Sequence, residues 1–281
     1  MLSEIVHTPE SLLRHPFALM RLMWSDLLAS RELAWRLMVR DISAQYRQAL
    51  LGIAWAFAPP VAMAIGLTLA RDAKVLAIGD TDIPYPAYVM FSVTLWQTFV
   101  EAISGPIQAV AQAKPMLARV NFPREALVLA KLGEVGFNFC IKLILIVGLF
   151  VYFRVPVSWS VFLAPVALFN LILLGTLVGV LLAPIGMLYL DISKSLNPIT
   201  NFWLFLTPVI FPVPEAGIFG TLVSWNPVTP LLVTTRELAT TGIVSNPGGF
   251  WLISGLTIVG VLATWVSFRI AMPYVVERVT S

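Results

Sequence analysis

The sequence predicts an all-α membrane protein with six transmembrane helices, and three observations carry that prediction. Of 281 residues, 58% are hydrophobic and only 12% are charged, whereas soluble domains carry about 25% charged residues. Long stretches contain no Asp, Glu, Lys or Arg, and about 20 apolar residues suffice for a helix to cross a bilayer. Lys and Arg are also distributed unevenly between the loops. This composition excludes soluble enzymes, nucleic-acid-binding domains and disordered proteins.

Six apolar segments fit a spanning helix and define a predicted transmembrane domain over residues 49–281. The expected spans are residues 50–70, 85–104, 130–153, 160–187, 196–213 and 249–269. The uncharged run 155–190 has 36 residues, which is long for one upright helix but too short for two with a turn. We expect one long or tilted helix there, with Pro156 and Pro184 near its ends.

The segment 216–235 is a different kind of uncharged run, because Gly217, Gly220, Pro227 and Pro230 interrupt it. A continuous helix is not expected there. Broken backbone at membrane depth is tolerated only where protein or a water-filled cavity surrounds it. The pattern therefore predicts short re-entrant or interfacial helices between spans five and six.

The positive charges predict the orientation of the chain. With an even number of spans and a cytoplasmic N-terminus, 13 Lys and Arg residues face the cytoplasm and 4 face the opposite side, while Lys142 lies inside the membrane. Positive residues accumulate on the cytoplasmic side of membrane proteins. The first 47 residues contain 11 charged side chains and no apolar core of a signal peptide. We therefore expect both termini in the cytoplasm.

The N-terminal region, residues 1–48, contains a predicted amphipathic helix over residues 31–47. Cations recur on one face at helical spacing, and apolar side chains occupy another. The first set is Arg36, Arg40, Ser43 and Arg47, and the second is Trp35, Met38, Val39, Ile42 and Tyr46. Such a helix is suited to lie on the inner membrane surface. Whether it also contacts a cytoplasmic partner is left open by the sequence.

No motif for chemistry or nucleotide binding is present in the chain. The sequence has no phosphate-binding G-x-x-x-x-G-K-[ST] loop, no G-x-S-x-G turn and no H-E-x-x-H pair. One cysteine, Cys140, and two histidines before the first span give no metal-site spacing. Asp72, Asp80 and Asp82 are better explained as solvated charges than as a metal or catalytic site. The chain is expected to move a substrate, not to transform it.

Four ionisable residues lie in or near the predicted spans, where such groups are rare and often functional. Lys131 and Glu134 are three residues apart on one helix face and can form an ion pair. Glu101 lies near the inner end of span two, and Lys142 is the deepest of the four. Structural pairing is favoured over a role in transport, and the sequence leaves both open.

Aromatic side chains concentrate in spans one and five. They include Trp55 and Phe57 in span one and Phe202, Trp203, Phe205 and Phe211 in span five. Packing or membrane anchoring explains any single one of them. Aromatic faces also suit stacking on the apolar faces of sugar rings.

Five short segments, in the same order along the chain, resemble ABC-2 type permeases that export polysaccharides. The likeness covers residues 35–270 and rests on residues 40–60, on 113–125 with its Phe-Pro-Arg-Glu ending, and on 189–192, 207–212 and 225–230. The resemblance implies a permease for O-antigen-type or teichoic-acid-type glycans in the bacterial inner membrane. It also implies a homodimer that binds two copies of a separate ATPase. That ATPase would hold ATP and Mg²⁺, and this chain would hold no cofactor.

The resemblance further implies roles for particular residues. It places an ATPase-coupling helix between spans two and three, with Met116, Arg119, Phe122, Pro123 and Arg124 as the matching positions. The amphipathic helix would contribute to the same contact through Trp35, Arg36, Arg40, Tyr46 and Arg47. Spans one and five would line the glycan channel, with Trp55, Phe57, Trp203, Phe205 and Phe211 as candidate lining residues. Re-entrant helices carrying Phe219 and Trp225 would form the outer gate.

The predicted function is therefore a channel-forming permease subunit of an ATP-driven exporter of a lipid-linked polysaccharide. Three alternatives remain open from the sequence. The first is an exporter of a drug or simple lipid in the same superfamily. The second is a membrane-embedded enzyme acting on a lipid-linked sugar, whose turnover would need Asp80 or Asp82 and no ATPase. The third is a scaffold for assembly, which predicts no nucleotide-dependent flux.

Overall fold

The computed structural model describes residues 16–47, 52–76, 78–117, 122–214 and 217–280, and every regular element in these ranges is a helix. The elements in chain order are α1 (Pro16–Arg47), η2 (Gly52–Ala56), α2 (Ala58–Asp72), α3 (Tyr85–Gln112), α4 (Lys114–Leu117), α5 (Glu125–Tyr152), η3 (Trp159–Leu163), α6 (Ala164–Leu188), α7 (Leu190–Phe205), α8 (Gly217–Trp225), α9 (Val228–Ala239) and α10 (Pro247–Thr280). The predicted all-α class is confirmed for the described part of the chain.

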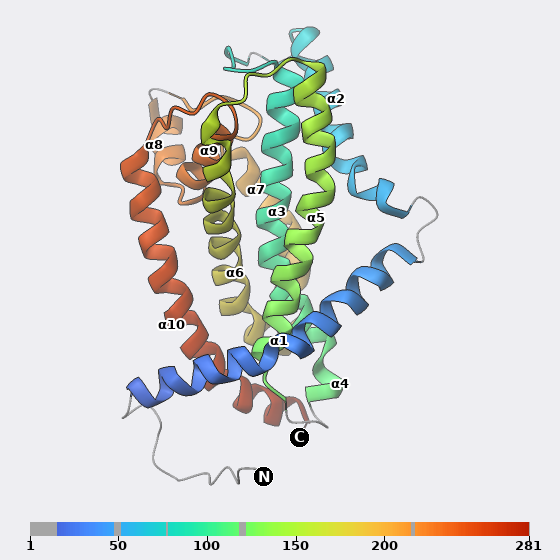
Figure 1. Cartoon of the computed structure of the whole chain (residues 1–281), viewed down its shortest axis with the longest axis vertical. Helices are drawn as coiled ribbons and strands as arrows, with labels where there is room; N and C mark the ends of the chain where they lie inside the picture. Colours follow the sequence, from blue (N-terminus) through green and yellow to red (C-terminus); the bar gives the residue numbers. More distant parts are fainter. Residues whose placement is uncertain (1–15, 48–51, 77, 118–121, 215–216, 281) are drawn as a thin grey trace.

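α3 forms the centre of a bundle in which α3, α5, α6 and α10 run along the long axis (Figure 1). It contacts α2, α5, α6, α7 and α9. Its side chains Leu95, Phe99, Ile103 and Ile107 are fully buried. The apolar core therefore follows α3 for most of its length.

Glycines on α6 allow its close approach to α3. A Cβ added at Gly179 would lie 2.4 Å from the carbonyl oxygen of Ile103, and one at Gly175 would lie 2.7 Å from that of Phe99. Small residues four apart let two helix backbones pack closely in membrane proteins. The Gly-x-x-x-Gly spacing on α6 is therefore the basis of the α3–α6 contact.

Three of the described helical segments are long and apolar enough to cross a membrane, namely α5, the continuous η3–α6 segment and α10. α3 has 28 residues but carries Ser92, Thr94 and Thr98, which are buried inside the protein. α2 and α7 have 15 and 16 residues, which correspond to about 23 and 24 Å of helix, less than the hydrocarbon core of about 30 Å. The spans predicted at 50–70 and 196–213 are therefore not continuous helices of those lengths.

Proline residues explain why α2 starts later, and α7 ends earlier, than the spans predicted at 50–70 and 196–213. α2 begins at Ala58 with prolines in its first turn, a position that suits proline because its missing N–H has no helical partner there. The residues before it form the separate 3-10 helix η2. α7 ends at Phe205, shortly before Pro208, which cannot continue the hydrogen-bond ladder. α7 also begins at Leu190, directly after α6, because only Tyr189 separates the two helices in an extended conformation.

The two ambiguous uncharged runs differ in the helices that they form. The run 155–190 contains one long helix, α6, preceded by η3. The run 216–235 is broken into α8 and α9 at Asn226–Pro227. α9 is buried over its whole length and contacts α3, α6, η3 and α10. α8 and α9 lie at the end of the bundle opposite α1 (Figure 1).

α1 is longer than the predicted helix, because it begins at Pro16 and not near residue 31. It lies across the end of the bundle where α4 and the end of α10 are also found (Figure 1). It packs against α5, and Ala34 and Leu37 join an apolar cluster with Leu127 and Phe268. The predicted domain boundary at residue 48 falls outside the described residues.

Candidate functional site

The residues predicted to couple the chain to an ATPase gather where α1, α3 and α5 meet. Met116 on α4 and Phe122 before α5 are partly buried, and both pack against an apolar cluster to which α1, α3, α4, α5, α6 and α10 contribute. Pro123 and Arg124 are also half-buried and directly precede α5. Arg119 lies outside the described residues. α4 itself is a single turn of four residues, and residues 122–124 directly before α5 are not helical.

Arg124 belongs to a group of charges at the same end of the molecule. Burial lowers the pKa of Arg124, while the neighbouring Glu125 carboxylate raises it and the Arg269 guanidinium lowers it. An arginine remains charged in proteins despite such shifts. Arg269 on α10 forms an ion pair with Asp26 on α1 and lies 3.4 Å from Glu125 on α5. This group therefore joins three helices of the bundle.

The predicted interface residues of α1 do not all share one environment. Trp35, Arg36 and Arg47 are exposed, whereas Tyr46 is half-buried against α5. Arg36 pairs with Glu32 at 2.6 Å, within α1. The predicted apolar face is thus divided between side chains that contact the protein and side chains, such as Trp35 and Val39, that remain exposed. α1 presents a packed face, an exposed apolar face and a cationic face.

A polar network connects α1 with α5. Lys131 lies 2.5 Å from Glu134 and 3.2 Å from Asp41 of α1. The predicted pairing of Lys131 with Glu134 is confirmed. Asp41 also accepts hydrogen bonds from Arg40, so this carboxylate links the cationic face of α1 to α5.

The network continues to α3 through the deepest lysine. Tyr46 donates to Asn138 at 3.0 Å, Asn138 donates to Glu101 at 3.2 Å, and Lys142 pairs with Glu101 at 2.5 Å. Burial raises the pKa of Tyr46, and the charges of Glu101 and Glu134 raise it further. The phenol is therefore neutral near neutral pH and able to donate. Lys142 is buried, and its charge is balanced by a partner 41 residues away in sequence.

The five predicted channel residues lie in different surroundings. Trp55 and Phe205 are exposed, and Phe57 is half-buried. Phe211 stacks in a tilted arrangement on Phe219 of α8, with ring centroids 5.2 Å apart. Exposed aromatic side chains are therefore present on η2 (Trp55) and on α7 (Phe205). In addition, the predicted channel residue Phe211 contacts the predicted gate residue Phe219.

Trp203 has a different role in the fold. Its ring packs edge-on against Trp96 and Phe99 of α3, at centroid distances of 6.1 and 5.4 Å. Its indole N–H donates to Asn226 Oδ1 at 3.1 Å. Trp203 thereby joins α7 to α3 and to the junction between α8 and α9. Trp225, the second predicted gate residue, is 83% exposed on α8.

Asn226 organises the predicted gate, and the sequence reasoning did not single it out. Its amide donates to Leu206 O at 3.0 Å and to Thr207 Oγ1 at 2.8 Å. Its Oδ1 also accepts from the backbone N–H of Val228 at 3.1 Å, next to the start of α9. Asn226 precedes Pro227, the N-cap residue of α9, and an Asn side chain that binds the backbone two residues later forms an Asx turn. The Asn-Pro pair before α9 was the available signal.

Arg236 is the second functional candidate that the sequence did not reveal. From the sequence alone it counts only as one of the four cations on the side opposite the cytoplasm. It is buried on α9 and donates to Ser92 Oγ at 3.0 Å and to the carbonyl oxygen of Pro208 at 3.2 Å. Its guanidinium lies 4.2 Å from the centroid of the Tyr88 ring, a cation–π geometry. Arg236 therefore fixes α9 and the turn after α7 against α3.

The end of α2 and the loop between α2 and α3 carry the three aspartates that were weighed from the sequence as a metal or catalytic site. Asp72, Asp80 and Asp82 are exposed, and Arg71 lies 3.8 Å from Asp80. Within the described ranges no group of three or more His, Cys, Asp or Glu side chains is placed to hold a metal ion. The interpretation of these aspartates as solvated charges fits their exposure.

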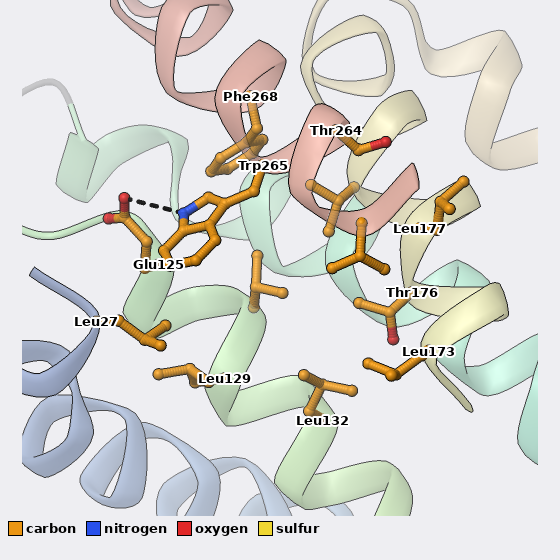
Figure 2. A pocket seen from close by; sticks show the side chains of 13 residues that line it. Leu27, Glu125, Leu129, Leu132, Leu173, Thr176, Leu177, Thr264, Trp265 and Phe268 are labelled. Atoms are coloured by element: carbon orange, nitrogen blue, oxygen red, sulfur yellow. Dashed lines mark hydrogen bonds between the residues drawn. The ribbon is translucent and has the colours of Figure 1, made fainter. Parts of the chain in front are cut away.

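A pocket of about 180 Å³ lies between α1, α5, α6 and α10 (Figure 2). Its wall is largely aliphatic, with Leu129, Leu132 and Leu177 among the lining residues. At one side, Trp265 Nε1 donates to Glu125 Oε1 at 3.4 Å, the contact drawn in Figure 2. The lining residues of this pocket include none of the residues predicted for coupling, channel or gate. The pocket does lie close to the predicted coupling residues, because Glu125 of its wall directly follows Arg124.

Comparison with known proteins identifies the family. The sequence pattern described as "ABC-2 type transporter" matches residues 32–238, which is more than half of the chain. The chain belongs to the ABC-2 type transporter family. The family expected from the five resembling segments is therefore confirmed, and membership of it indicates a membrane subunit of a transporter rather than an enzyme. Together with the apolar helices α5, α6 and α10, this makes it an integral membrane protein.

The ABC-2 chain is also similar to two curated permeases over most of their length. It is 23% identical to the O-antigen export system permease protein RfbA of Myxococcus xanthus, covering 76% of this chain and 82% of the relative. It is 21% identical to the protein of the same name from Klebsiella pneumoniae, covering 82% and 87%.

Proposed function

We propose that this chain is the channel-forming permease subunit of an ATP-driven exporter of a lipid-linked, O-antigen-like polysaccharide. The observation that carries the proposal is the family match over residues 32–238 together with relatives named O-antigen export permeases. Two copies of the chain would pair and bind two copies of a separate ATPase. The exporter of a drug or simple lipid is not favoured, because the relatives export O-antigen.

The proposed topology has six membrane crossings, made by α2, α3, α5, α6, α7 and α10. α2 and α7 are short, but η2 and the turn at 206–211 extend them toward the membrane surfaces. α3 can cross despite its polar residues because Ser92, Thr94 and Thr98 are buried within the bundle. The end with α1 and α4 faces the cytoplasm in this topology, in line with the excess of Lys and Arg there.

The ATPase is proposed to act on the surface formed by α4 and residues 122–124. Met116 and Phe122 contact the same apolar cluster as α1, α3 and α5, so a displacement of this surface acts on all three helices. α1 would follow because Lys131 and Asn138 of α5 bind Asp41 and Tyr46. A displacement of this surface by the ATPase would therefore be transmitted to the helices of the bundle.

The proposed passage runs between two copies along α2 and α7. Trp55 and Phe205 expose aromatic faces there, and many weak stacking contacts suit a long polymer better than one deep site. At the far end, α8 and α9 would gate the passage, with Phe219 and Trp225 exposed on α8. α9 is held in place by Arg236 and Asn226, which leaves α8 as the movable part.

The coupling assignment is tested by co-expressing the chain with its ATPase and measuring complex formation and ATP-dependent export. Phe122→Ala and Arg124→Ala are expected to reduce both. Phe162→Ala and Arg154→Ala are matched controls, because both residues are exposed and belong to the segment between α5 and α6, at the other end of these helices. Equal complex formation and export in all four variants would overturn the assignment.

The enzyme alternative makes a separate prediction for the first outer loop. If the chain acted as an enzyme on a lipid-linked sugar, Asp80→Asn or Asp82→Asn would abolish turnover by the purified chain without an ATPase. The proposed function predicts no such turnover in the unaltered chain and normal export in both variants.

A further inference from the structure

The pocket between α5, α6 and α10 lies in the half of the bundle nearer α1. Its wall on α5 extends from Glu125, the first residue of that helix, to Leu132, which is about 10 Å along the axis. Leu27 of α1 contributes to the same wall. In Figure 2, Glu125 and Leu27 lie on one side of the pocket, and Leu173 and Thr176 lie on the other.

The pocket arises because α5 and α10 pack on different partners. α10 packs mainly against α6 and α9, whereas α5 packs mainly against α1 and α3. α6 forms the wall between them through Leu173 and Val180. Leu262 of α10, beside the lining residue Val261, is exposed. The pocket therefore lies next to the surface that α10 presents to lipid.

The size and lining of the pocket suit an apolar chain. Cavities of about 150 Å³ lined by aliphatic and aromatic side chains bind small apolar molecules in preference to water. The present pocket has about 180 Å³, and only a few of its lining side chains carry polar atoms. Its elongated wall along α5 fits an extended hydrocarbon chain.

Charged side chains of both signs lie at the side of the pocket nearer α1. Glu125 is part of its wall, and Arg269 joins Glu125 to Asp26. Arg124 precedes Glu125 and is influenced by both Glu125 and Arg269. These two cations and two carboxylates complement a headgroup with both a phosphate and an ammonium. Guanidinium groups bind phosphate oxygens, and carboxylates accept hydrogen bonds from a primary ammonium.

A tryptophan completes the arrangement. Trp265 lines the pocket and directs its N–H toward Glu125 (Figure 2). Tryptophan is enriched where hydrocarbon meets the headgroup region, because its ring is apolar and its N–H needs a polar partner. Trp265 and Glu125 therefore mark the level at which a bound headgroup would meet its tail.

We propose that this pocket binds one acyl chain of a phospholipid whose headgroup carries a phosphate and a primary amine, as in phosphatidylethanolamine. The tail lies between α5 and α10, and the headgroup lies against Arg124, Glu125, Arg269 and Asp26. The bound lipid ties α10 to α1 and α5 beside the proposed coupling surface. This proposal depends on the proposed function in one respect, which is that α1 lies at the cytoplasmic leaflet.

The test is photo-cross-linking of the full chain in phosphatidylcholine nanodiscs. The probe is a small fraction of phosphatidylethanolamine with a diazirine in one acyl chain, and labelled residues are mapped by mass spectrometry. The unaltered chain is expected to be labelled at Leu129, Leu177 or their neighbours in the pocket, at least fivefold above the exposed face of α10. Equal labelling of the pocket and that exposed face would overturn the proposal.

A matched pair of variants tests the pocket itself. Val261→Trp places a large ring in the cavity, whereas Leu262→Trp adds the same ring to the exposed face of α10. Labelling of the pocket is expected to fall at least fivefold in the first variant and to stay unchanged in the second. Because the mapping on the unaltered chain needs no substitution, a variant that fails to fold does not remove the test.

Competition identifies the headgroup. The phosphatidylcholine of the nanodisc is the background, because its amine cannot donate hydrogen bonds. Unlabelled phosphatidylethanolamine that replaces part of it is expected to reduce labelling of the pocket more strongly than the same amount of phosphatidylglycerol, which has no amine. Equal competition by phosphatidylglycerol would overturn the headgroup assignment. Stronger competition by a polyprenyl phosphate would assign the pocket to a lipid carrier instead. Labelling needs no ATPase or export, so its failure and a failure of the proposed function are distinguishable.

Discussion

At the residue scale, the Lys142–Glu101 pair shows how a charge is accommodated inside the bundle. Lys142 is buried and Glu101 is half-buried. Asn138 donates a hydrogen bond to the Glu101 carboxylate and accepts one from Tyr46. Removing one partner of a buried pair is costly, because the other charge is left uncompensated. The nearby Lys131–Glu134 pair could be predicted from its spacing on one helix. The Lys142–Glu101 pair could not, because it depends on how α3 and α5 are packed.

Replacing Glu101 alone is expected to destabilise the protein more than replacing both partners. Glu101→Gln leaves the Lys142 ammonium buried without a carboxylate, at a cost on the order of 3 kcal/mol. The double variant Glu101→Gln, Lys142→Met removes both charges and should recover most of this loss. Thermal unfolding in detergent measures both. A double variant less stable than Glu101→Gln would contradict the pairing.

Asn226 gives a second prediction at this scale. Asn226→Ala removes the hydrogen bonds that hold Trp203, Thr207 and the start of α9, and is expected to cost about 2 kcal/mol because buried partners lose their bonds. Asn170→Ala is the control, since Asn170 donates only to the carbonyl oxygen of Val166 one turn earlier in its own helix. The same melting experiment should show a clear decrease for the first variant and little change for the second.

At the element scale, the positions of the strongly apolar helices could be read from the sequence, and the ends of the short ones could not. α5 and α6 coincide closely with predicted spans because lipid requires a long apolar run. α10 contains the span predicted at 249–269 but continues to Thr280. α2 and α7 are shorter than predicted because hydropathy does not show where proline starts or ends a helix within an apolar stretch. The break between α8 and α9 was visible, because Pro227 lies between two glycine- and proline-containing segments.

The close contact of α3 with α6 yields a prediction for an element. Gly179→Ala would place a methyl group 2.4 Å from the Ile103 carbonyl oxygen, so the helices must separate, at an expected cost of about 2 kcal/mol. Gly255→Ala on α10 is the matched control because no atom lies within 4 Å of its added Cβ. It should leave stability unchanged or raise it slightly, since alanine favours helix over glycine. Similar melting temperatures for the two variants would contradict this packing.

At the scale of the whole molecule, α1, α4 and the end of α10 lie at one end, and α8 and α9 lie at the other (Figure 1). The sequence predicted this division from its positive charges and its broken segment. It could not predict that α1 would bind α5 through Asp41 and Tyr46, or that Arg236 would be buried between α9 and α3. Those contacts depend on residues far apart in the chain.

The orientation of the molecule can be tested by cysteine labelling. In a Cys140→Ser background, Ile243→Cys places a thiol in the exposed segment between α9 and α10, and Lys114→Cys places one at the exposed start of α4. A membrane-impermeant maleimide is expected to label Ile243→Cys in intact spheroplasts and Lys114→Cys only after permeabilisation. The reverse pattern would place the proposed coupling surface outside the cell.

The proposed function is tested most directly by transport into inverted membrane vesicles that contain the chain, its ATPase and the lipid-linked polysaccharide. Polysaccharide is expected to accumulate inside the vesicles only when ATP, the ATPase and this chain are all present. Accumulation without this chain, or nucleotide hydrolysis by this chain alone, would contradict the proposed function.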